Sequence, residues 1–211
     1  MNVHPLLVLG AAFLLGALPF GLWVGRLARG VDVRQHGSGN LGATNVYRSL
    51  GARLGLTVFA LDAGKGVAAV VLARALAGAS FPGGDNAAGL CGAIIAVLGH
   101  SFTPFAGFRG GKGAATAAGA MLAATPAASS VALAGFIAAV ATTRRISVGS
   151  LVAAVLLPLG LWLLPFAWQG NFAAWTGTAV GVLIVLRHLP NVRRILRGEE
   201  PTFDFRGGGA R

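Results

Sequence analysis

Residues 146–165 read ISVGSLVAAVLLPLGLWLLP, a run of twenty positions without one charged side chain. A helix needs about 20 predominantly apolar residues to cross the hydrocarbon core of a bilayer. Inside a bilayer every backbone N–H and C=O must be satisfied within the protein, and a helix does this within the segment itself. The stretch therefore predicts a membrane-spanning helix, and with it an integral membrane protein.

The composition extends this prediction to the whole chain. Of its 211 residues, 55% are hydrophobic and 11% are charged, with a mean hydropathy of +0.73, whereas a soluble domain carries about 25% charged residues. The net charge of +11 would suit a nucleic-acid-binding protein. The basic residues, however, fall between apolar runs, so nucleic acid is excluded as a partner. No polar linker divides the chain, and residues 1–211 are predicted to form a single transmembrane domain.

Other apolar runs have similar lengths. Together with the first they are Pro5–Val24, Leu54–Ala73, Ala87–Phe105, Ile146–Pro165 and Phe172–Leu189. Residues 114–143 are too many for one span and few for two. Within them Thr125-Pro126 is typical of a helix start, with threonine as the N-cap and proline at the first helical position. The sequence therefore predicts an all-α protein with seven transmembrane helices, of which the fourth is short and ends near Ala124.

The basic residues favour seven spans over six. With seven, 15 of the 17 lysines and arginines lie on one side of the membrane, while Arg74 lies on the other and Lys65 within the second span. The positive-inside rule then places the N-terminus outside and the C-terminus in the cytoplasm. With six spans, Arg144, Arg145 and the basic tail would lie on the wrong side. Asp62, three positions before Lys65, is expected to form an ion pair with it inside the helix bundle.

Residues 36–51, HGSGNLGATNVYRSLG, form the first of three unusual cytoplasmic segments. Leu41–Leu50 is predicted to form a short helix that ends at Gly51. Thr44 and Arg48 then lie one turn apart on the same face. Because glycines precede this helix and Ser, Asn and Arg side chains lie near its start, the segment is typical of an anion-binding site.

The second segment, residues 99–116, reads GHSFTPFAGFRGGKGAAT, and glycines again open a helix. Lys112 adds a mobile point charge, and His100 is interpreted as a structural support for the Lys112 loop. The segment is not a nucleotide-binding P-loop, because Ala106 and Gly113 stand where that motif requires glycine and a hydroxyl residue.

The third segment, residues 187–194, reads RHLPNVRR. Its arginines are expected to anchor the protein to anionic lipid, but His188 and Asn191 are not needed for anchoring. Pro190 between them disfavours a continuous helix, so the sequence does not establish that the two side chains share a face.

The acidic residues exclude several chemistries. There are six in the chain, and they form no cluster that could bind Mg²⁺ or Ca²⁺. No nucleophile elbow is present. The polar segments therefore predict a site that holds anions and polarises a carbonyl group, without a metal ion or a protein nucleophile.

These segments resemble three motifs of the bacterial acyl-phosphate:glycerol-3-phosphate acyltransferases of the PlsY type. The first resemblance covers residues 38–48, the second residues 99–116, and the third Arg187-His188 with Asn191. The length, the seven spans and the intramembrane Asp62/Lys65 pair agree with that family over essentially the whole chain. Arg109 replaces a lysine that is common before the two glycines.

The resemblance implies the transfer of a fatty acyl group from acyl phosphate to the 1-hydroxyl of glycerol 3-phosphate, which yields lysophosphatidate and phosphate without a metal or cofactor. The residues implied as catalytic are Ser38, Asn40, Arg48, Lys112, His188 and Asn191. Substrate contacts are implied for these six and for Gly39, Thr44, Asn45, Gly110, Gly111, Arg145 and Ser147.

Roles within this set follow the family's motifs. Ser38, Gly39, Asn40 and Thr44 are expected around the acyl phosphate, Arg48 and Lys112 on phosphate, and His188 and Asn191 on glycerol 3-phosphate. Gly110 and Gly111 are expected to let the backbone approach an anion. For Arg145 and Ser147, substrate contact and membrane topology remain equal alternatives.

The implied location is the bacterial plasma (inner) membrane, with several spans, contact with membrane lipid, and an active site that faces the cytoplasm. The sequence leaves open whether an acyl-phosphate-forming enzyme docks on the basic face. The main alternative is a membrane transporter or binding protein for an organic phosphate. Such a site is expected near the bilayer midplane with access from both sides, whereas the polar residues here gather on one face.

Overall fold

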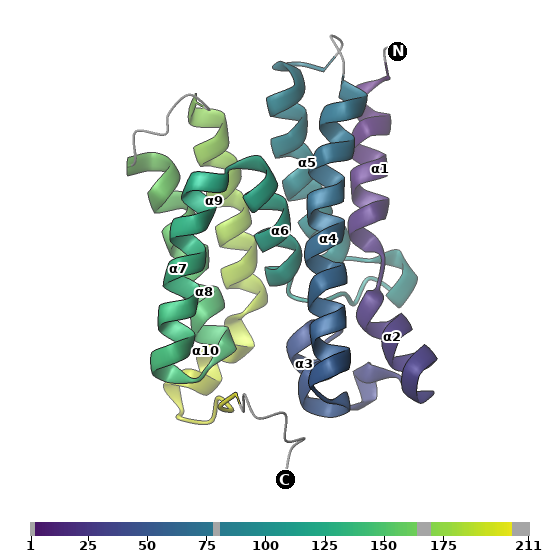
Figure 1. Ribbon diagram of the computed structural model, residues 1–211, viewed down its shortest axis with the longest axis vertical. Helices are drawn as coiled ribbons and strands as arrows, with labels where there is room; N and C mark the ends of the chain where they lie inside the picture. Colours follow the sequence, from purple (N-terminus) through teal and green to yellow (C-terminus); the bar gives the residue numbers. More distant parts are fainter. Residues whose placement is uncertain (1–2, 78–80, 164–169, 204–211) are drawn as a thin grey trace.

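The computed structural model describes residues 3–77, 81–163 and 170–203, and every regular element in these ranges is helical. Figure 1 shows the helices running mostly along one axis. The α-helices are α1 (Pro5–Ala17), α2 (Phe20–Arg29), α3 (Ala43–Leu50), α4 (Ala52–Ala77), α5 (Gly84–Ser101), α6 (Ala114–Ala124), α7 (Pro126–Thr143), α8 (Ile146–Leu163), α9 (Gly170–Arg187) and α10 (Leu189–Leu196). Two 3₁₀ turns, η1 (Val33–Gln35) and η3 (Pro104–Ala106), lie in the connections.

The helices form two groups with α6 between them (Figure 1). Helices α1, α4 and α5 pack on one another, and α8 packs on both α7 and α9. Helices α2, α3 and α10 lie together at one end of the molecule, which we call the basic end. The polar segments singled out in the sequence are therefore brought to the same end of the helix bundle.

Five stretches among the described residues are long and apolar enough to cross a membrane: Pro5–Arg29, Ala52–Ala77, Gly84–Ala106, Pro126–Thr143 and Ile146–Leu163. Helices α9 and α10 meet the same criteria only as a pair, and they bend by 57°. Helix α6, with 11 residues, is shorter than a full span. These lengths fit the all-α membrane fold. The predicted count of seven spans is reached only if the bent pair counts as one span and the short helix α6 as another.

The first predicted span, Pro5–Val24, is interrupted. Helix α1 ends at Ala17, and α2 begins at Phe20 and continues to Arg29. Pro19 lies in the interruption, where it has no N–H to continue the helical hydrogen bonds. Pro5–Arg29 still qualifies as one candidate span, so the structure agrees with the predicted first span and adds a break within it. Positions 164 and 165 of the predicted span that begins at Ile146 lie outside the described residues.

The break after α6 was predicted correctly. Thr125 is the N-cap of α7 and Pro126 its first residue. The Thr125 side chain does not cap α7, however, because its hydroxyl donates to the Met121 carbonyl at 3.0 Å. The carbonyls at the end of α6 are satisfied from α4, where the Arg74 guanidinium donates to Ala123 O at 3.1 Å and Ala124 O at 3.4 Å. A cation at this end also complements the helix dipole.

Helix α4 holds α6 by very close backbone contact. A Cβ on Gly66 would overlap the Thr116 carbonyl of α6, and a Cβ on Gly119 would overlap the Ala63 carbonyl of α4. Small residues at such crossings let two helices pack closely in a membrane. Since α6 follows the Lys112 loop directly, this contact helps to place that loop.

We therefore expect Gly119→Ala to destabilise the protein by about 1–3 kcal/mol, the usual effect of overpacking. The thermal unfolding midpoint in detergent measures this change. Gly64→Ala on α4 is the matched control, because a Cβ at Gly64 has no neighbour within 4 Å. Equal midpoints for the two variants would contradict the close packing of α4 on α6.

Candidate active site

Lys112 lies at the centre of the basic end, between α6 and α10. Its Nζ donates to Asn191 Oδ1 at 2.5 Å, across 79 positions of sequence. Asn191 is buried in the first turn of α10, whereas the Lys112 side chain is partly buried. The structure thus brings together the second and third segments, through the two residues that were expected to bind phosphate and glycerol 3-phosphate.

The electrostatic surroundings weaken the hold of Lys112 on its proton. Burial and the positive charges of nearby arginines, of which Arg194 acts most strongly, lower the pKa of the Lys112 amine from 10.5 to about 8. The negative charge of Glu200 opposes this shift. A phosphate group would add to the negative charge of Glu200 and stabilise the protonated amine. The site is therefore suited to a phosphate group.

The glycine loop, residues 110–113, is held by its own backbone. Gly110 N donates to Ser101 O at 3.2 Å, and Gly111 N donates to His100 O at 3.1 Å. A Cβ at Gly110 would overlap the His100 carbonyl, and one at Gly111 would overlap the His100 ring. These glycines therefore permit the loop to approach the end of α5. Both N–H groups are engaged there, and the expected approach of these two backbone positions to an anion stays a prediction.

Arg187 completes the support of this loop. Its guanidinium donates to Gly110 O at 3.1 Å and to Gly111 O at 2.9 Å. The same group lies over the Phe102 ring, 5.5 Å from the ring centroid. The sequence places Arg187 in the third motif but predicts no role for it in the site, because only the folded chain brings the end of α9 beside the loop.

The start of α6 supplies further anion-binding groups. Its N-cap, Gly113, has a φ of 82°, which glycine adopts without strain, and makes no side-chain capping bond. The first N–H groups of a helix have no acceptor within the helix, and together with the helix dipole they favour a bound anion. Lys112 stands one residue before this cap.

Glu200 is a buried carboxylate next to Asn191 for which the sequence predicted no role. Its side chain is buried, and Oε1 accepts hydrogen bonds from Ser147 Oγ at 2.6 Å and Asn191 Nδ2 at 2.7 Å. Arg194 Nε donates to Oε2 at 2.7 Å. Burial raises the pKa of the Glu200 carboxyl, but these hydrogen bonds outweigh it and leave the pKa below its usual value. Glu200 therefore remains ionised and fixes the orientation of the Asn191 amide.

The backbone carbonyls of Glu200 and Pro201 accept hydrogen bonds from two further basic side chains. Arg145 Nε donates to Glu200 O at 3.1 Å, and Arg48 donates to Pro201 O at 3.2 Å. The Tyr47 and Phe203 rings lie with their centroids 4.5 Å apart. The C-terminal segment, residues 199–203, thus links α3, the start of α8 and α10. Arg145 and Ser147 both contact this segment.

His188 lies at the bend between α9 and α10, where the sequence predicted that Pro190 would interrupt the helix. Its Nδ1 is 2.8 Å from Ile184 O. Because a carbonyl oxygen only accepts, Nδ1 carries the hydrogen, and Nε2 of the neutral ring is left as an acceptor. Asn191 N donates to His188 O at 2.8 Å, which joins the two residues across the bend.

The first segment forms a folded loop before α3. The Asn45 amide is buried and donates to the Val33, His36 and Asn40 carbonyls, while its oxygen accepts from Ser38 N at 2.8 Å. The hydrogen bonds of the Asn45 side chain therefore lie within the loop and give this residue a structural role there, while its expected substrate contact stays a prediction. The helix begins at Ala43, two residues later than predicted, and Gly42 N is bound by Asn40 Oδ1 at 2.9 Å.

Four other expected substrate-binding residues of this segment lie near its surface. Ser38 and Gly39 are exposed, and Asn40 and Thr44 are partly exposed. Among the described residues, no hydrogen bond joins these four to Lys112, Asn191 or Glu200. Within the same described part of the chain, no three His, Cys, Asp or Glu side chains are grouped as metal ligands.

Comparison with known proteins agrees with this arrangement. The model of the glycerol-3-phosphate acyltransferase family matches residues 6–198. A glycerol-3-phosphate acyltransferase of Anaeromyxobacter dehalogenans is 43% identical over 196 residues, which cover 92% of this chain and 94% of the relative. One from Synechococcus elongatus is 41% identical over 192 residues, which cover 90% of each chain.

Two solved structures have the same fold. Both are of PlsY (YgiH), an integral membrane glycerol 3-phosphate acyltransferase. The glycerol 3-phosphate form is 34% identical and aligns with a TM-score of 0.83, over 95% of this chain and 96% of that one. The lysophosphatidic acid form is 33% identical, with a TM-score of 0.81 over 95% of each chain. The chain therefore belongs to the glycerol-3-phosphate acyltransferase family.

Proposed function

We propose that this protein transfers a fatty acyl group from acyl phosphate to the 1-hydroxyl of glycerol 3-phosphate and releases lysophosphatidate and inorganic phosphate. The observation that carries the proposal is the Lys112 amine, held by Asn191 beside the open N-terminus of α6. The related PlsY structures, in glycerol 3-phosphate and lysophosphatidic acid forms, support the acceptor and the product. Nothing in the geometry or the relatives favours the transporter alternative.

The reaction needs orientation and charge stabilisation more than a protein nucleophile. The glycerol hydroxyl oxygen attacks the acyl carbonyl carbon, the carbon–oxygen bond to phosphate breaks, and phosphate leaves with the hydroxyl proton. Acyl phosphate is a mixed anhydride with a good leaving group, so alignment of the substrates supplies much of the acceleration. Fixed cations and N–H groups stabilise the charge that develops on the phosphate.

The residues take the following roles in this proposal. Lys112 and Arg48 bind phosphate, with the first N–H groups of α6. Asn191 holds the Lys112 amine, and His188 Nε2 accepts a hydrogen bond from the attacking hydroxyl. Ser38, Gly39, Asn40 and Thr44, at the mouth of the site, contact the acyl phosphate. Ser147 and Arg145 act through the Glu200 segment that they hold.

We further propose seven spans in the bacterial inner membrane, with α6 as the short fourth and the basic end in the cytoplasm. Exposed arginines at this end, such as Arg193 and Arg197, suit anionic lipid and the docking of an acyl-phosphate-forming enzyme. Cys91 is the one cysteine of the sequence, so a Cys91→Ala background permits single-cysteine labelling. A cysteine at Gly198 should react only from the cytoplasmic side; reaction from the opposite side would contradict this orientation.

The activity should depend on the charge of Lys112. Because its pKa is about 8, the amine is protonated below that pH and loses its charge above it. We expect kcat/KM for glycerol 3-phosphate to fall above pH 8, by about tenfold per pH unit, in initial-rate measurements from pH 6 to 10. In a Lys112→Arg variant that retains activity, this fall should be absent, because arginine stays charged. A flat wild-type profile to pH 10 would contradict the assigned role of Lys112.

The acyl donor is tested by offering one donor at a time. Purified protein in lipid vesicles receives glycerol 3-phosphate with either palmitoyl phosphate or palmitoyl-CoA, without added metal. We expect lysophosphatidate only from palmitoyl phosphate. Product from palmitoyl-CoA alone would show that the donor is a thioester and would overturn this part of the proposal.

A further inference from the structure

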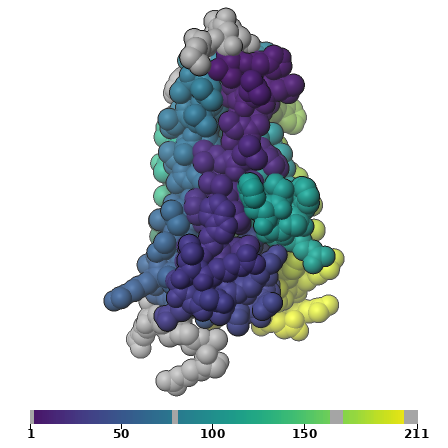
Figure 2. Space-filling view, turned by 90° about the vertical axis from the view of Figure 1, so that its right-hand side faces the viewer, coloured from purple at the N-terminus to yellow at the C-terminus, as the bar shows by residue number. Residues whose placement is uncertain are grey.

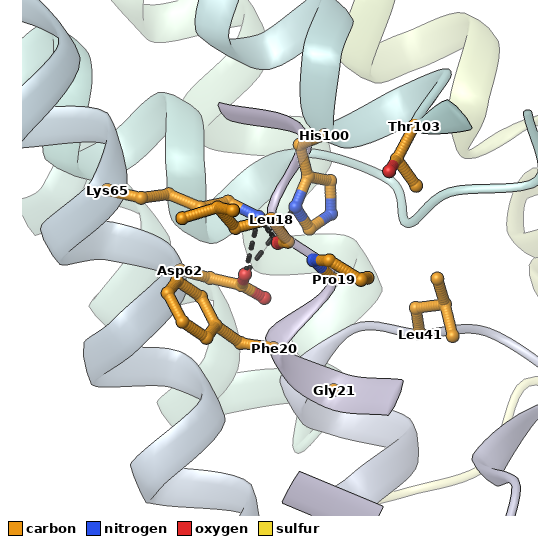
Figure 3. Close-up of a pocket in the computed structure, with 9 residues that line it drawn as sticks. All are labelled: Leu18, Pro19, Phe20, Gly21, Leu41, Asp62, Lys65, His100 and Thr103. Carbon is orange, nitrogen blue, oxygen red and sulfur yellow. Dashed lines mark hydrogen bonds and ion pairs between the residues drawn. The ribbon is translucent and has the colours of Figure 1, made fainter. Parts of the chain in front are cut away.

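A pair of opposite charges is buried where α4 meets the break between α1 and α2 (Figure 3). Lys65 Nζ lies 2.8 Å from Asp62 Oδ1, which confirms the ion pair expected from the sequence. Asp62 is 1% exposed and Lys65 4%. Replacing such a buried pair by apolar residues of similar volume is often neutral or stabilising. Stability alone therefore gives no sufficient reason for these charges.

Lys65 fixes the pair to the α1–α2 break. Its Nζ also donates to Leu18 O at 2.7 Å (Figure 3), and Thr103 Oγ1 donates to Ala17 O at 2.5 Å. These carbonyls lie at the end of α1, where the break after Ala17 leaves them without the N–H partners of a continuing helix; Leu18 O also accepts from Phe20 N at 3.1 Å. The break is thus held by one side chain from α4 and one from the segment after α5.

Asp62 connects the pair to the glycine loop through His100. The His100 Nδ1 atom lies 3.6 Å from Asp62 Oδ1 and 3.2 Å from Thr116 Oγ1, in the first turn of α6. The opposite edge of the ring lies against Gly111, where it leaves no room for a Cβ. The position of this imidazole therefore determines the path of the backbone directly before Lys112.

The geometry also shows that the pair acts indirectly. The cavity between Asp62, Lys65, His100 and the α1–α2 break has a volume of about 10 Å³, room for no more than about one water molecule. A phosphate ester does not fit there. The charges that act on the Lys112 amine are those of Glu200 and of three arginines, and Asp62 and Lys65 are not among them.

We propose that Asp62 and Lys65 are positioning residues, which hold the His100 ring and through it the glycine loop and Lys112 in the orientation that binds the substrate phosphate. These contacts begin at the α1–α2 break, which Lys65 and Thr103 hold by hydrogen bonds. Helix α4 thereby determines, from within the bilayer, the positions of the start of α6 and of the glycine loop before it. This inference rests on the proposed function, because it assigns the loop to phosphate binding.

The test uses the full-length Asp62→Leu/Lys65→Met double variant in detergent or lipid, since the double change removes both charges and keeps similar volumes. We expect its Kd for glycerol 3-phosphate, measured by calorimetry without acyl donor, to rise about tenfold or more, as for a misplaced binding group. KM for glycerol 3-phosphate should rise in parallel. Thr116→Val, a smaller change at the other contact of His100, should raise Kd by about threefold and provides a second test should the double variant not fold.

Val70→Ala is the matched control for stability, because Val70 is buried on α4 in the core beside α6 and has no part in these contacts. It should lower the thermal unfolding midpoint and leave Kd and KM within twofold of wild type. Kd and KM within twofold of wild type in the double variant, or in Thr116→Val, would overturn the inference. If wild type binds glycerol 3-phosphate but transfers no acyl group, the proposed function fails, and the ratio of Kd values still decides the positioning role.

Discussion

Lys112→Ala should lower kcat/KM for acyl transfer by about 10³-fold. The amine is held beside the start of α6, and removing one preorganised charge donor from such a site typically costs 10²–10³-fold or more. The variant should fold, because the Lys112 side chain is only partly buried and is not part of the hydrophobic core. Initial rates with palmitoyl phosphate and glycerol 3-phosphate measure the effect.

Arg109→Ala provides the matched control for this variant. Arg109 precedes the same glycine loop but is exposed, so its removal should change kcat/KM by less than about threefold, as expected for a surface cation. Near-normal turnover in a folded Lys112→Ala protein would remove Lys112 from the mechanism. A loss of the same size in both variants would show that the general positive charge of the loop, and not the Lys112 amine, is what matters.

Glu200→Gln should impair both folding stability and catalysis. The carboxylate accepts from Ser147, Asn191 and Arg194, and a neutral amide cannot satisfy all three donors. Loss of one partner in a buried charged network costs about 2–4 kcal/mol. With Asn191 no longer fixed, the Lys112 amine loses its orientation, and we expect kcat/KM to fall about 10- to 100-fold. The unfolding midpoint and the initial rate report the two effects separately.

Glu199→Gln controls for the same change in charge one residue earlier. Glu199 is exposed, so this variant should match wild type in both measurements. The account of the C-terminal segment would be wrong if Glu200→Gln also behaved like wild type, or if Glu199→Gln were equally damaging.

Much of the fold could be predicted because apolar length and breaking residues report local structure directly. Helix α8 begins at Ile146 and α7 at Pro126, both as predicted. The break at Pro19 was missed, because the apolar run continues through it and the carbonyls of Ala17 and Leu18 at the end of α1 are bound by Thr103 and Lys65 from distant parts of the chain. Sequence periodicity carries no signal for such long-range compensation.

The site was predicted in part, for a similar reason. Motif resemblance identified Lys112 and Asn191, and the structure pairs them. It did not indicate Glu200 or Arg187, since an acidic residue in a basic tail and an arginine at a helix end both resemble ordinary surface charges. It also implies anion contact for Gly110 and Gly111, which stays a prediction, and it gave no sign that their small size lets the loop pack on His100 and Ser101.

The exposed surface relates the site to the bilayer. Figure 2 shows the segment between α5 and α6 projecting from the face of the molecule as a teal bulge, above the basic end. Phe105 and Phe108 of this segment are 52% and 65% exposed. Aromatic side chains at this level suit the interface between lipid and water. The acyl tail of a substrate could therefore remain in the bilayer while its phosphate reaches Lys112.

The proposed acyl transfer is best tested by following both products of one reaction. Purified protein in lipid vesicles receives palmitoyl phosphate and glycerol 3-phosphate, with EDTA and without CoA. Lysophosphatidate and inorganic phosphate should form in equal amounts, and neither should form above background when glycerol 3-phosphate is omitted. Phosphate release without lysophosphatidate, or no reaction by a folded protein that binds glycerol 3-phosphate, would contradict the proposed transfer.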